Sequence, residues 1–132
     1  MRVRLALPGL VALLAAGCGG TVVGPTENGR VVTPPKGNPA AGKVVFLRNA
    51  CGGCHTFTPA GTTAKVGPDL DQLPDYAKKA NVPLEDYTRA AIVSPPAPYV
   101  PPGFPTNAMP TTYGTSLSAQ QVSDLVAFLT ER

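Results

Sequence analysis

The sequence predicts one small all-α domain with long proline-rich loops. Helix-start signals open two of its segments, and the C-terminal segment repeats apolar residues at helical spacing. No run of alternating apolar and polar residues is long enough to predict a strand. With 132 residues, the chain has room for one domain and hardly for two.

The chain opens with the composition of an export signal. Arg2 and Arg4 precede an apolar run over residues 5–16, and small residues lead from there to Cys18. This order is typical of a signal peptide. A retained membrane anchor is the weaker interpretation, because the run is too short to span a bilayer comfortably. We expect residues 1–17 to be the signal.

The end of this segment, "LLAAGC", resembles a bacterial lipoprotein signal, in which the cysteine becomes the lipidated first residue of the mature chain. Ala15 stands where that family usually has leucine, and the alternative is an ordinary signal peptide that ends near a cysteine. The resemblance predicts cleavage before Cys18 and acyl chains on that residue, which would anchor the protein stably. We expect an exported protein, in the periplasm or on the extracytoplasmic face of a bacterial membrane.

The charge balance gives no indication of nucleic-acid binding. The whole chain has eleven Lys and Arg residues and eight Asp and Glu residues. Removal of the signal leaves nine against eight, and from Ala40 onward the numbers are seven and seven. The basic character of the full chain therefore belongs mainly to the signal, and the basic patch that nucleic acid requires is missing.

A region rich in Gly, Pro, Thr and Val follows Cys18. We interpret residues 18–37 as a flexible tether that joins the membrane to a folded head over residues 38–132. Val31–Val32 favours a short strand, for which the sequence offers no obvious partner.

The first helix of the head is predicted to begin at residue 38. Asn38 is a good N-cap and Pro39 is tolerated at the first helical position. The helix should run to about Asn49 and lead directly into Cys51. Its apolar face is expected to consist of Ala41, Val44, Val45 and Leu47 or Arg48.

Three further helical segments are predicted. One is a weak turn over residues 74–80, and another is a helix over residues 82–94, which the Ser94–Pro95 junction ends. The last begins at Ser118, which forms a capping box with Gln121. Its apolar residues follow i, i+3, i+4, i+7 spacing: Val122, Leu125, Val126 and Leu129.

Residues 94–110 contain seven prolines. Proline breaks helices and favours extended backbone, so this segment should form a stiff loop. A long ordered loop in a small domain is usually functional. Because short helices bury little surface by themselves, a head of this size also needs a staple, a metal or a cofactor for stability.

Two of the three cysteines and the only histidine fall within "CGGCH", residues 51–55. The pattern C-x-x-C-H is typical of covalent haem attachment. Cys51 and Cys54 would form thioethers with the two vinyl positions on one edge of the porphyrin, and His55 would ligate the iron. One haem c would also supply the missing part of the core.

Three other interpretations of this stretch are weaker. Zinc needs four ligands, and the only further thiol is that of Cys18, at the far end of the tether. A thioredoxin-like dithiol requires a βαβ context, which the sequence lacks. A structural disulfide is compatible with export but leaves His55 and the stiff loop without a role.

The second axial ligand follows by elimination. His55 is the only histidine, and Met109 is the only methionine besides the initiator, which the signal carries away. A lone methionine often fills a gap in a core, but Met109 lies in the proline-bounded "NAMP", outside any helical apolar stripe. We therefore expect His55 and Met109 to be the two metal ligands.

From about residue 38 to residue 132 the sequence resembles a class I cytochrome c of the small bacterial, monohaem kind. Four pieces carry the resemblance in order along the chain: "AGKVVFLRNACGGCHT", "GPDL", "NAMP" and "LSAQQVSDLVAFL". The resemblance implies a small helical domain around one covalent haem. It implies that the Pro68 carbonyl accepts a hydrogen bond from the proximal imidazole. It also implies that Gly42 and Phe46 meet the last helix, on which Phe128 stands where the family often has tyrosine.

Two departures from the family pattern affect its partners and loops. Residues 95–105 contain more proline than the pattern requires. The lysine-rich surface of mitochondrial members is missing, so the sequence does not predict a strongly acidic partner.

His/Met ligation leaves no open iron position, so such a centre transfers electrons and does not activate a substrate. We expect a one-electron carrier between membrane-associated respiratory or photosynthetic complexes, with no enzymatic activity and no small-molecule substrate. Alternatives are a haem subunit of one oxidase or dehydrogenase, and a haem sensor or enzyme in which Met109 is displaced. The last would need an acid/base group near Met109, and the sequence shows no obvious one.

Overall fold

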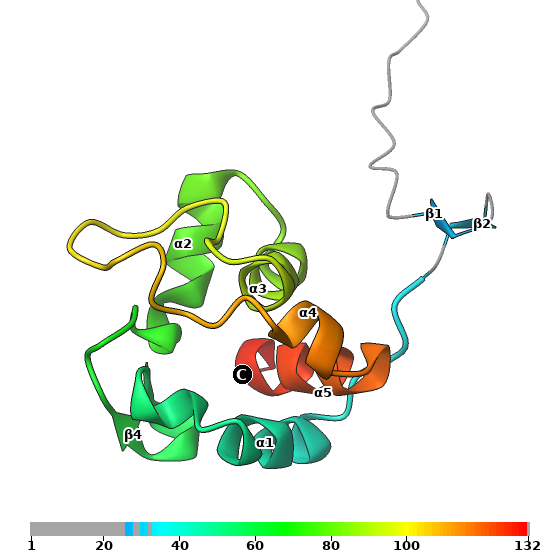
Figure 1. Cartoon of the computed structure of the whole chain (residues 1–132), viewed down its shortest axis with the longest axis horizontal. Coiled ribbons are helices and arrows are strands. Elements are labelled where there is room, and N and C mark those ends of the chain that lie inside the picture. Colours follow the sequence, from blue (N-terminus) through cyan, green and yellow to red (C-terminus); the bar gives the residue numbers. More distant parts are fainter. Residues whose placement is uncertain (1–25, 28–29, 32, 132) are drawn as a thin grey trace, which may run out of the picture. The chain divides into compact units, whose positions relative to one another are not determined.

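The computed structural model describes residues 26–27, 30–31 and 33–131, which belong to two units divided after Val32. The second unit contains every described helix (Figure 1). The predicted signal over residues 1–17, the predicted lipidation site Cys18 and most of the predicted tether lie outside the described residues. In the described part of the chain, no helix has the length and apolar character to cross a membrane.

The first unit contains one two-stranded antiparallel pair. Strand β1 (Thr26–Glu27) pairs with β2 (Arg30–Val31), so that Thr26 stands opposite Val31. The prediction that a strand at Val31 would lack a partner is wrong. The partner strand has only two residues, too few for an alternating pattern to indicate it.

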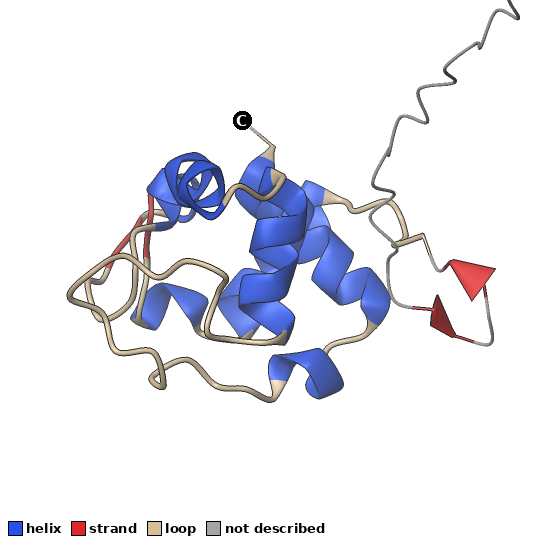
Figure 2. Cartoon of the chain, turned by 90° about the horizontal axis from the view of Figure 1, so that it is seen from above, coloured by secondary structure: helices blue, strands red, loops and turns tan. Residues whose placement is uncertain are grey.

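Helices α1 (Pro39–Arg48) and α5 (Ala119–Thr130) are the first and last helices of the second unit in the sequence. They pack against each other (Figures 1 and 2). Both begin as predicted. The Asn38 side chain accepts hydrogen bonds from two backbone N–H groups of the first turn of α1. Ser118 and Gln121 form the capping box of α5. The four predicted apolar residues of α5 are all buried.

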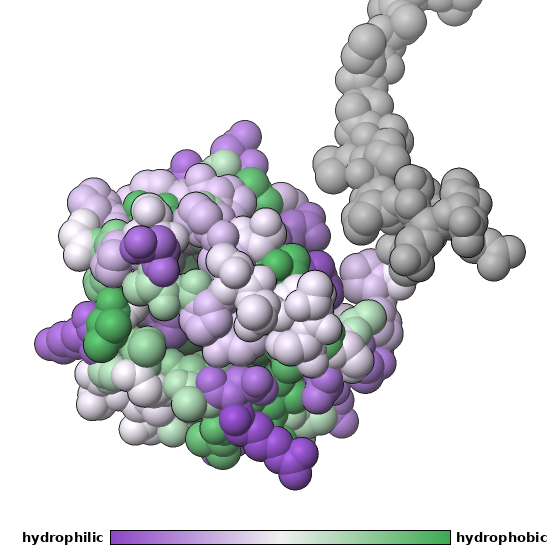
Figure 3. All heavy atoms as spheres, in the orientation of Figure 1, coloured by the Kyte–Doolittle hydropathy of each residue, from purple (hydrophilic) through white to green (hydrophobic). Residues whose placement is uncertain are grey.

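The apolar face predicted for α1 is partly wrong. Val44 and Leu47 are 46% and 57% exposed, whereas Gly42, Val45 and Phe46 are buried. The reason is the close approach of the two helices at Gly42, where a Cβ atom would overlap the Asp124 carbonyl oxygen on α5. This contact turns the 42–45–46 face toward α5 and leaves the other apolar side chains in solvent. Figure 3 shows hydrophobic surface among hydrophilic side chains along its lower edge, where α1 lies in Figure 1.

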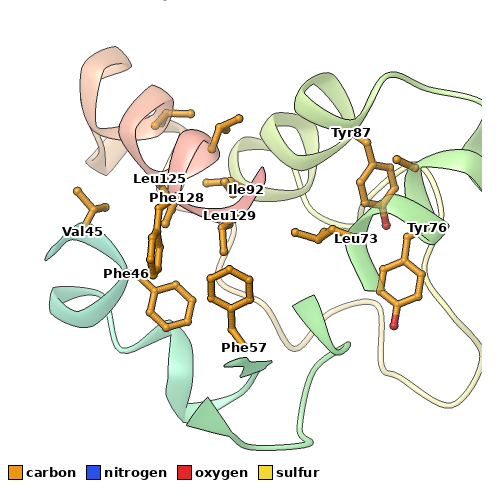
Figure 4. Packing of buried hydrophobic residues seen from close by; sticks show 13 residues of the cluster. Val45, Phe46, Phe57, Leu73, Tyr76, Tyr87, Ile92, Leu125, Phe128 and Leu129 are labelled. Carbon is orange, nitrogen blue, oxygen red and sulfur yellow. The ribbon is translucent and has the colours of Figure 1, made fainter. Parts of the chain in front are cut away.

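Three phenylalanines form the centre of the packing between α1 and α5 (Figure 4). The ring centroids of Phe46 and Phe57 lie 5.9 Å apart, those of Phe46 and Phe128 5.7 Å, and those of Phe57 and Phe128 5.3 Å. The edge-to-face geometry of the last two pairs is the arrangement that aromatic rings prefer. The implied contact of Gly42 and Phe46 with the last helix is therefore present.

The segment after α1 is made of short turns and one small strand pair. It contains the 3-10 turns η1 (Cys51–Gly53), η2 (Thr58–Ala60) and η3 (Leu70–Gln72). Strands β3 (Thr56–Phe57) and β4 (Thr62–Thr63) pair antiparallel and enclose η2. The sequence predicted no strands in the head, and the pair of β3 and β4 is an addition to a domain that is otherwise helical, as predicted.

Helices α2 (Leu73–Ala80) and α3 (Leu84–Val93) match the predicted segments within two residues. As predicted, residues 94–112 form no helix. The short helix α4 (Tyr113–Ser116) was not predicted. It lies close to α3, because a Cβ atom on Gly114 would come within 2.5 Å of the Val93 carbonyl oxygen.

Residues 36–38 form a strap along α5. The Gln120 side chain donates a hydrogen bond to the Lys36 carbonyl at 2.9 Å, and the Asn38 N–H donates one to the Asp124 carboxylate at 2.8 Å. Gly37 lies against the backbone of Ser123, where no side chain would fit. The last residues of the segment predicted as tether thus contact the helical domain, and they cover the polar side of α5.

Candidate functional site

An apolar cavity of about 220 Å³ lies inside the second unit. Its walls come from α1 and the segment between α1 and η3, from α2, α3 and α5, and from the proline-rich loop and α4. All five residues predicted for haem binding line it: Cys51, Cys54, His55, Pro68 and Met109. Within the described part of the chain, no Lys, Arg, Asp or Glu residue lines this cavity.

The backbone around η1 directs the two cysteines and the histidine to one wall of the cavity. Ala50 takes the left-handed conformation (φ 52°), and the chain then turns back over η1. The Cys51 carbonyl accepts hydrogen bonds from the N–H groups of Cys54 at 3.2 Å and His55 at 3.1 Å. The five residues of the C-x-x-C-H motif thus form one tight turn, which holds the side chains of Cys51, Cys54 and His55 close together.

The two intervening glycines have different surroundings. A Cβ atom on Gly52 would overlap the methyl group of Thr62, whereas one on Gly53 would meet nothing within 4 Å. The Thr62 hydroxyl also donates a hydrogen bond to the His55 carbonyl at 2.9 Å. Close packing of β4 against η1 therefore requires a glycine at position 52, and position 53 is open.

The His55 imidazole is fixed in one orientation by a hydrogen bond. Its Nδ1 lies 2.6 Å from the Pro68 carbonyl oxygen, which can only accept, so Nδ1 carries the proton. Nε2 makes no hydrogen bond to any described residue. Burial lowers the pKa of His55, and the bond to Pro68 partly opposes this effect. A neutral imidazole with a free Nε2 is the form that ligates iron.

Gly67 supports this imidazole and was not singled out by the sequence. A Cβ atom at this position would lie 2.6 Å from His55 Cε1 and 3.0 Å from both ring nitrogens. The Gly67 N–H donates a hydrogen bond to the Cys54 carbonyl at 2.7 Å. Gly67 is the first residue of the "GPDL" motif, but a single sequence does not show which glycine packs against another side chain.

Met109 reaches the cavity from the proline-rich loop. It is half-buried, between the exposed residues Ala108 and Pro110. In Figure 1 this loop, drawn in yellow to orange, and the segment that ends in β4 lie along different sides of the domain. Four residues after Met109, the Tyr113 hydroxyl donates a hydrogen bond to the Asn49 carbonyl at 3.3 Å, which connects the loop end to the residues before Cys51.

Cys51 and Cys54 are both free thiols in this structure. Cys54 is exposed and Cys51 is half-buried. Burial raises the pKa of the Cys51 thiol. Among the described residues, no three or more His, Cys, Asp or Glu side chains are arranged to hold a metal ion by themselves.

These residues fit a haem. Two thiols on one turn suit covalent attachment to one porphyrin edge, and the apolar walls suit the ring. The imidazole has one nitrogen held by a backbone carbonyl, as metal-ligating histidines usually have, and the thioether of Met109 lines the same cavity. The fold and the site define a small helical protein for a covalently bound haem.

The comparison with protein-family models agrees with this description. The cytochrome c family model matches residues 39–132, so the chain belongs to the cytochrome c family. It is thus a haem-based electron carrier with covalently bound c-type haem, from a family whose members are usually extracytoplasmic. A search of the curated proteins found no match to the chain.

Proposed function

We propose that the protein is a one-electron carrier with a single haem, attached through Cys51 and Cys54 and ligated by His55 and Met109. The observation that carries this proposal is the convergence of the four side chains on one apolar cavity, although Met109 is 54 positions beyond His55 in the sequence. The hydrogen bond from His55 Nδ1 to the Pro68 carbonyl supports the choice of Nε2 as the ligand atom.

The chain's own residues set the properties of the centre. A c-type haem supplies the one-electron chemistry of its iron. The Pro68 carbonyl increases the electron density of the imidazole, and the Met109 thioether favours a high reduction potential. His55 and Met109 would both ligate the iron and leave no position for a substrate, so we propose that the protein is not an enzyme.

We further propose that lipidation of Cys18 holds the protein on the extracytoplasmic face of a bacterial membrane. The signal-like composition of residues 1–17 supports this. A lipid anchor would keep the carrier close to membrane-bound redox complexes, its donor and acceptor, and raise its effective concentration there. Replacement of Cys18 by serine should then move the protein from the membrane fraction to the soluble fraction.

The decisive experiment on the ligands is Met109→Ala. We expect the haem to stay bound after acid–acetone extraction while the midpoint potential falls strongly, because the thioether that favours reduced iron is lost. An unchanged potential would show that Met109 is not the ligand.

Carbon monoxide distinguishes the carrier from a sensor or enzyme with a displaceable methionine. We expect the reduced native protein to bind carbon monoxide slowly or not at all, and the Met109→Ala variant to bind it rapidly. Rapid, stoichiometric binding by the native protein would favour the sensor or enzyme.

A further inference from the structure

Three tyrosines gather at one end of the cavity. Tyr76 of α2, Tyr87 of α3 and Tyr99 of the proline-rich loop all line it. The Tyr87 hydroxyl donates a hydrogen bond to the Tyr99 carbonyl at 2.6 Å, and the rings of Tyr76 and Tyr99 lie 6.2 Å apart. Figure 4 shows Tyr76 and Tyr87 beside each other, across the core from Phe46. We call these three residues the tyrosine cluster.

The cysteines mark a different end of the cavity. Burial, and then the thiols of Cys51 and Cys54, raise the pKa of Tyr113 on α4, so this phenol lies near the attachment turn. Burial, and then the other two phenols of the tyrosine cluster, raise the pKa of Tyr87 to about 12. Each end of the cavity thus has its own tyrosine hydroxyls, and only Tyr113 is influenced by the cysteines.

A haem attached to Cys51 and Cys54 would place its two carboxylates at the opposite end of the cavity, where they need polar partners. The two vinyl positions that form thioethers lie on one side of the porphyrin, and its two carboxylates lie on the other. A carboxylate that leaves water needs hydrogen-bond donors or a cation. No described Lys or Arg lines the cavity, but the Lys79 Nζ lies 5.5 Å from the centre of the Tyr99 ring, at the tyrosine cluster.

The donors of the cluster are not equivalent. The Tyr87 hydroxyl is already used in its bond to the Tyr99 carbonyl. Burial raises the pKa of Tyr76, and Asp69, Tyr99 and Asp75 raise it further, so the two aspartates would repel another carboxylate beside Tyr76. The Tyr99 hydroxyl makes no hydrogen bond to a described residue, and it is therefore available to donate.

We propose that Tyr99 and Lys79 form the binding site for a haem carboxylate, and that Tyr87 is a positioning residue that holds Tyr99 there. The proposal rests on the proposed attachment at Cys51 and Cys54, which directs the opposite porphyrin edge to the tyrosine cluster. The Lys79 ammonium and the Tyr99 hydroxyl offset part of the carboxylate's negative charge. Since negative charge near the iron favours its oxidised state, this site raises the midpoint potential.

The test compares two neighbouring lysines of α2. Lys79→Gln and Lys78→Gln remove the same charge from adjacent, exposed positions. We expect Lys79→Gln to lower the midpoint potential at low ionic strength, Lys78→Gln to change it little, and Lys79→Arg to retain the native value. Equal shifts in the two glutamine variants, or no shift in either, would overturn the proposal.

A second pair of variants tests the hydroxyl. Tyr99→Phe keeps the ring and the carbonyl that Tyr87 binds, and Tyr113→Phe is the control at the cysteine end. We expect Tyr99→Phe to shift the haem carboxylate band in resonance Raman spectra and to lower the potential, and Tyr113→Phe to leave that band unmoved. An unmoved carboxylate band with covalent haem still bound would overturn the carboxylate site alone, whereas haem that is extracted from the native protein by acid–acetone would overturn the attachment itself.

Discussion

The half of the domain formed by α1 and α5 and the half that surrounds the cavity are stabilised in different ways. In the first, the rings of Phe46, Phe57 and Phe128 contact one another, and α1 approaches α5 closely at Gly42. In the second, α2, α3 and the proline-rich loop turn apolar side chains toward the cavity. Protein atoms complete the first half, whereas we expect the haem to complete the core of the second.

This difference shows how a domain of about a hundred residues overcomes a shortage of core. Domains of this size bury a smaller fraction of their surface than larger ones. A covalently held haem fills the space that further side chains would otherwise occupy. The residues that contribute most to stability should therefore differ between the halves. Between α1 and α5 they should be glycines and aromatic rings, whereas beside the cavity they should be the two cysteines that attach the haem.

The largest effect should come from removing the attachment. In a Cys51→Ser, Cys54→Ser double variant, we expect no pigment after acid–acetone extraction and loss of cooperative unfolding. Hydrogen exchange should show lower protection in α2 and α3 than in α1 and α5, because α1 and α5 also pack against each other through Phe46, Phe57 and Phe128. A pigment-free double variant with native helicity and cooperative unfolding would contradict the division into two halves.

The next effect concerns the contact between α1 and α5. Gly42→Val would push a branched side chain into the backbone of α5, and overpacking of this kind costs about 2–3 kcal/mol of the free energy of unfolding. Chemical denaturation of the haem-loaded protein measures this loss. Gly53→Ala is the matched control, because its added methyl group meets nothing within 4 Å. Equal losses in both variants would show that close packing at Gly42 is not the cause.

A smaller effect is expected beside the imidazole. Gly67→Ala places a methyl group against the His55 ring and should lower the free energy of unfolding by about 1–2 kcal/mol. It should also lengthen the bond from His55 to the Pro68 carbonyl, which makes the imidazole a weaker base and raises the midpoint potential. Voltammetry measures this shift. A loss of stability with no change in potential would mean that Gly67 does not position the ring.

The smallest effect should be the loss of one helix cap. Ser118→Ala removes the side chain that accepts a hydrogen bond from the Gln121 N–H, and the loss of an N-cap costs about 1 kcal/mol. Ser116→Ala, at the end of α4, is the control, because its hydroxyl caps no helix. If denaturation midpoints of the two variants coincide, the capping box contributes nothing to the packing of α5.

Local signals in the sequence predicted the helices well. Asn38, Ser118 and the Ser94–Pro95 junction act on the few residues beside them, so the ends of α1, α3 and α5 could be placed without knowledge of the fold. The cytochrome c family and its all-α fold were predicted from motifs that keep their order along the chain, and both are confirmed. Short elements such as α4 and the two strand pairs are too brief to show any periodicity.

Features that depend on the packing of distant segments were missed. Val44 and Leu47 look like core residues in the sequence, and only the approach of α5 at Gly42 decides that they face solvent. Gly67 and the tyrosine cluster have no local pattern, because their neighbours come from other elements. The predicted haem residues line one cavity, and their roles as attachment points and ligands remain predictions.

The strap would have a mechanical effect if the proposed lipid anchor at Cys18 holds the protein by its N-terminal end. Tension along the chain reaches Lys36 before it reaches α1, and there Gln120 takes up the load on α5. The hydrogen bond from Gln120 would therefore carry this force before the first turn of α1 does. A pull on the proposed membrane anchor would thus place little strain on the turn at Cys51.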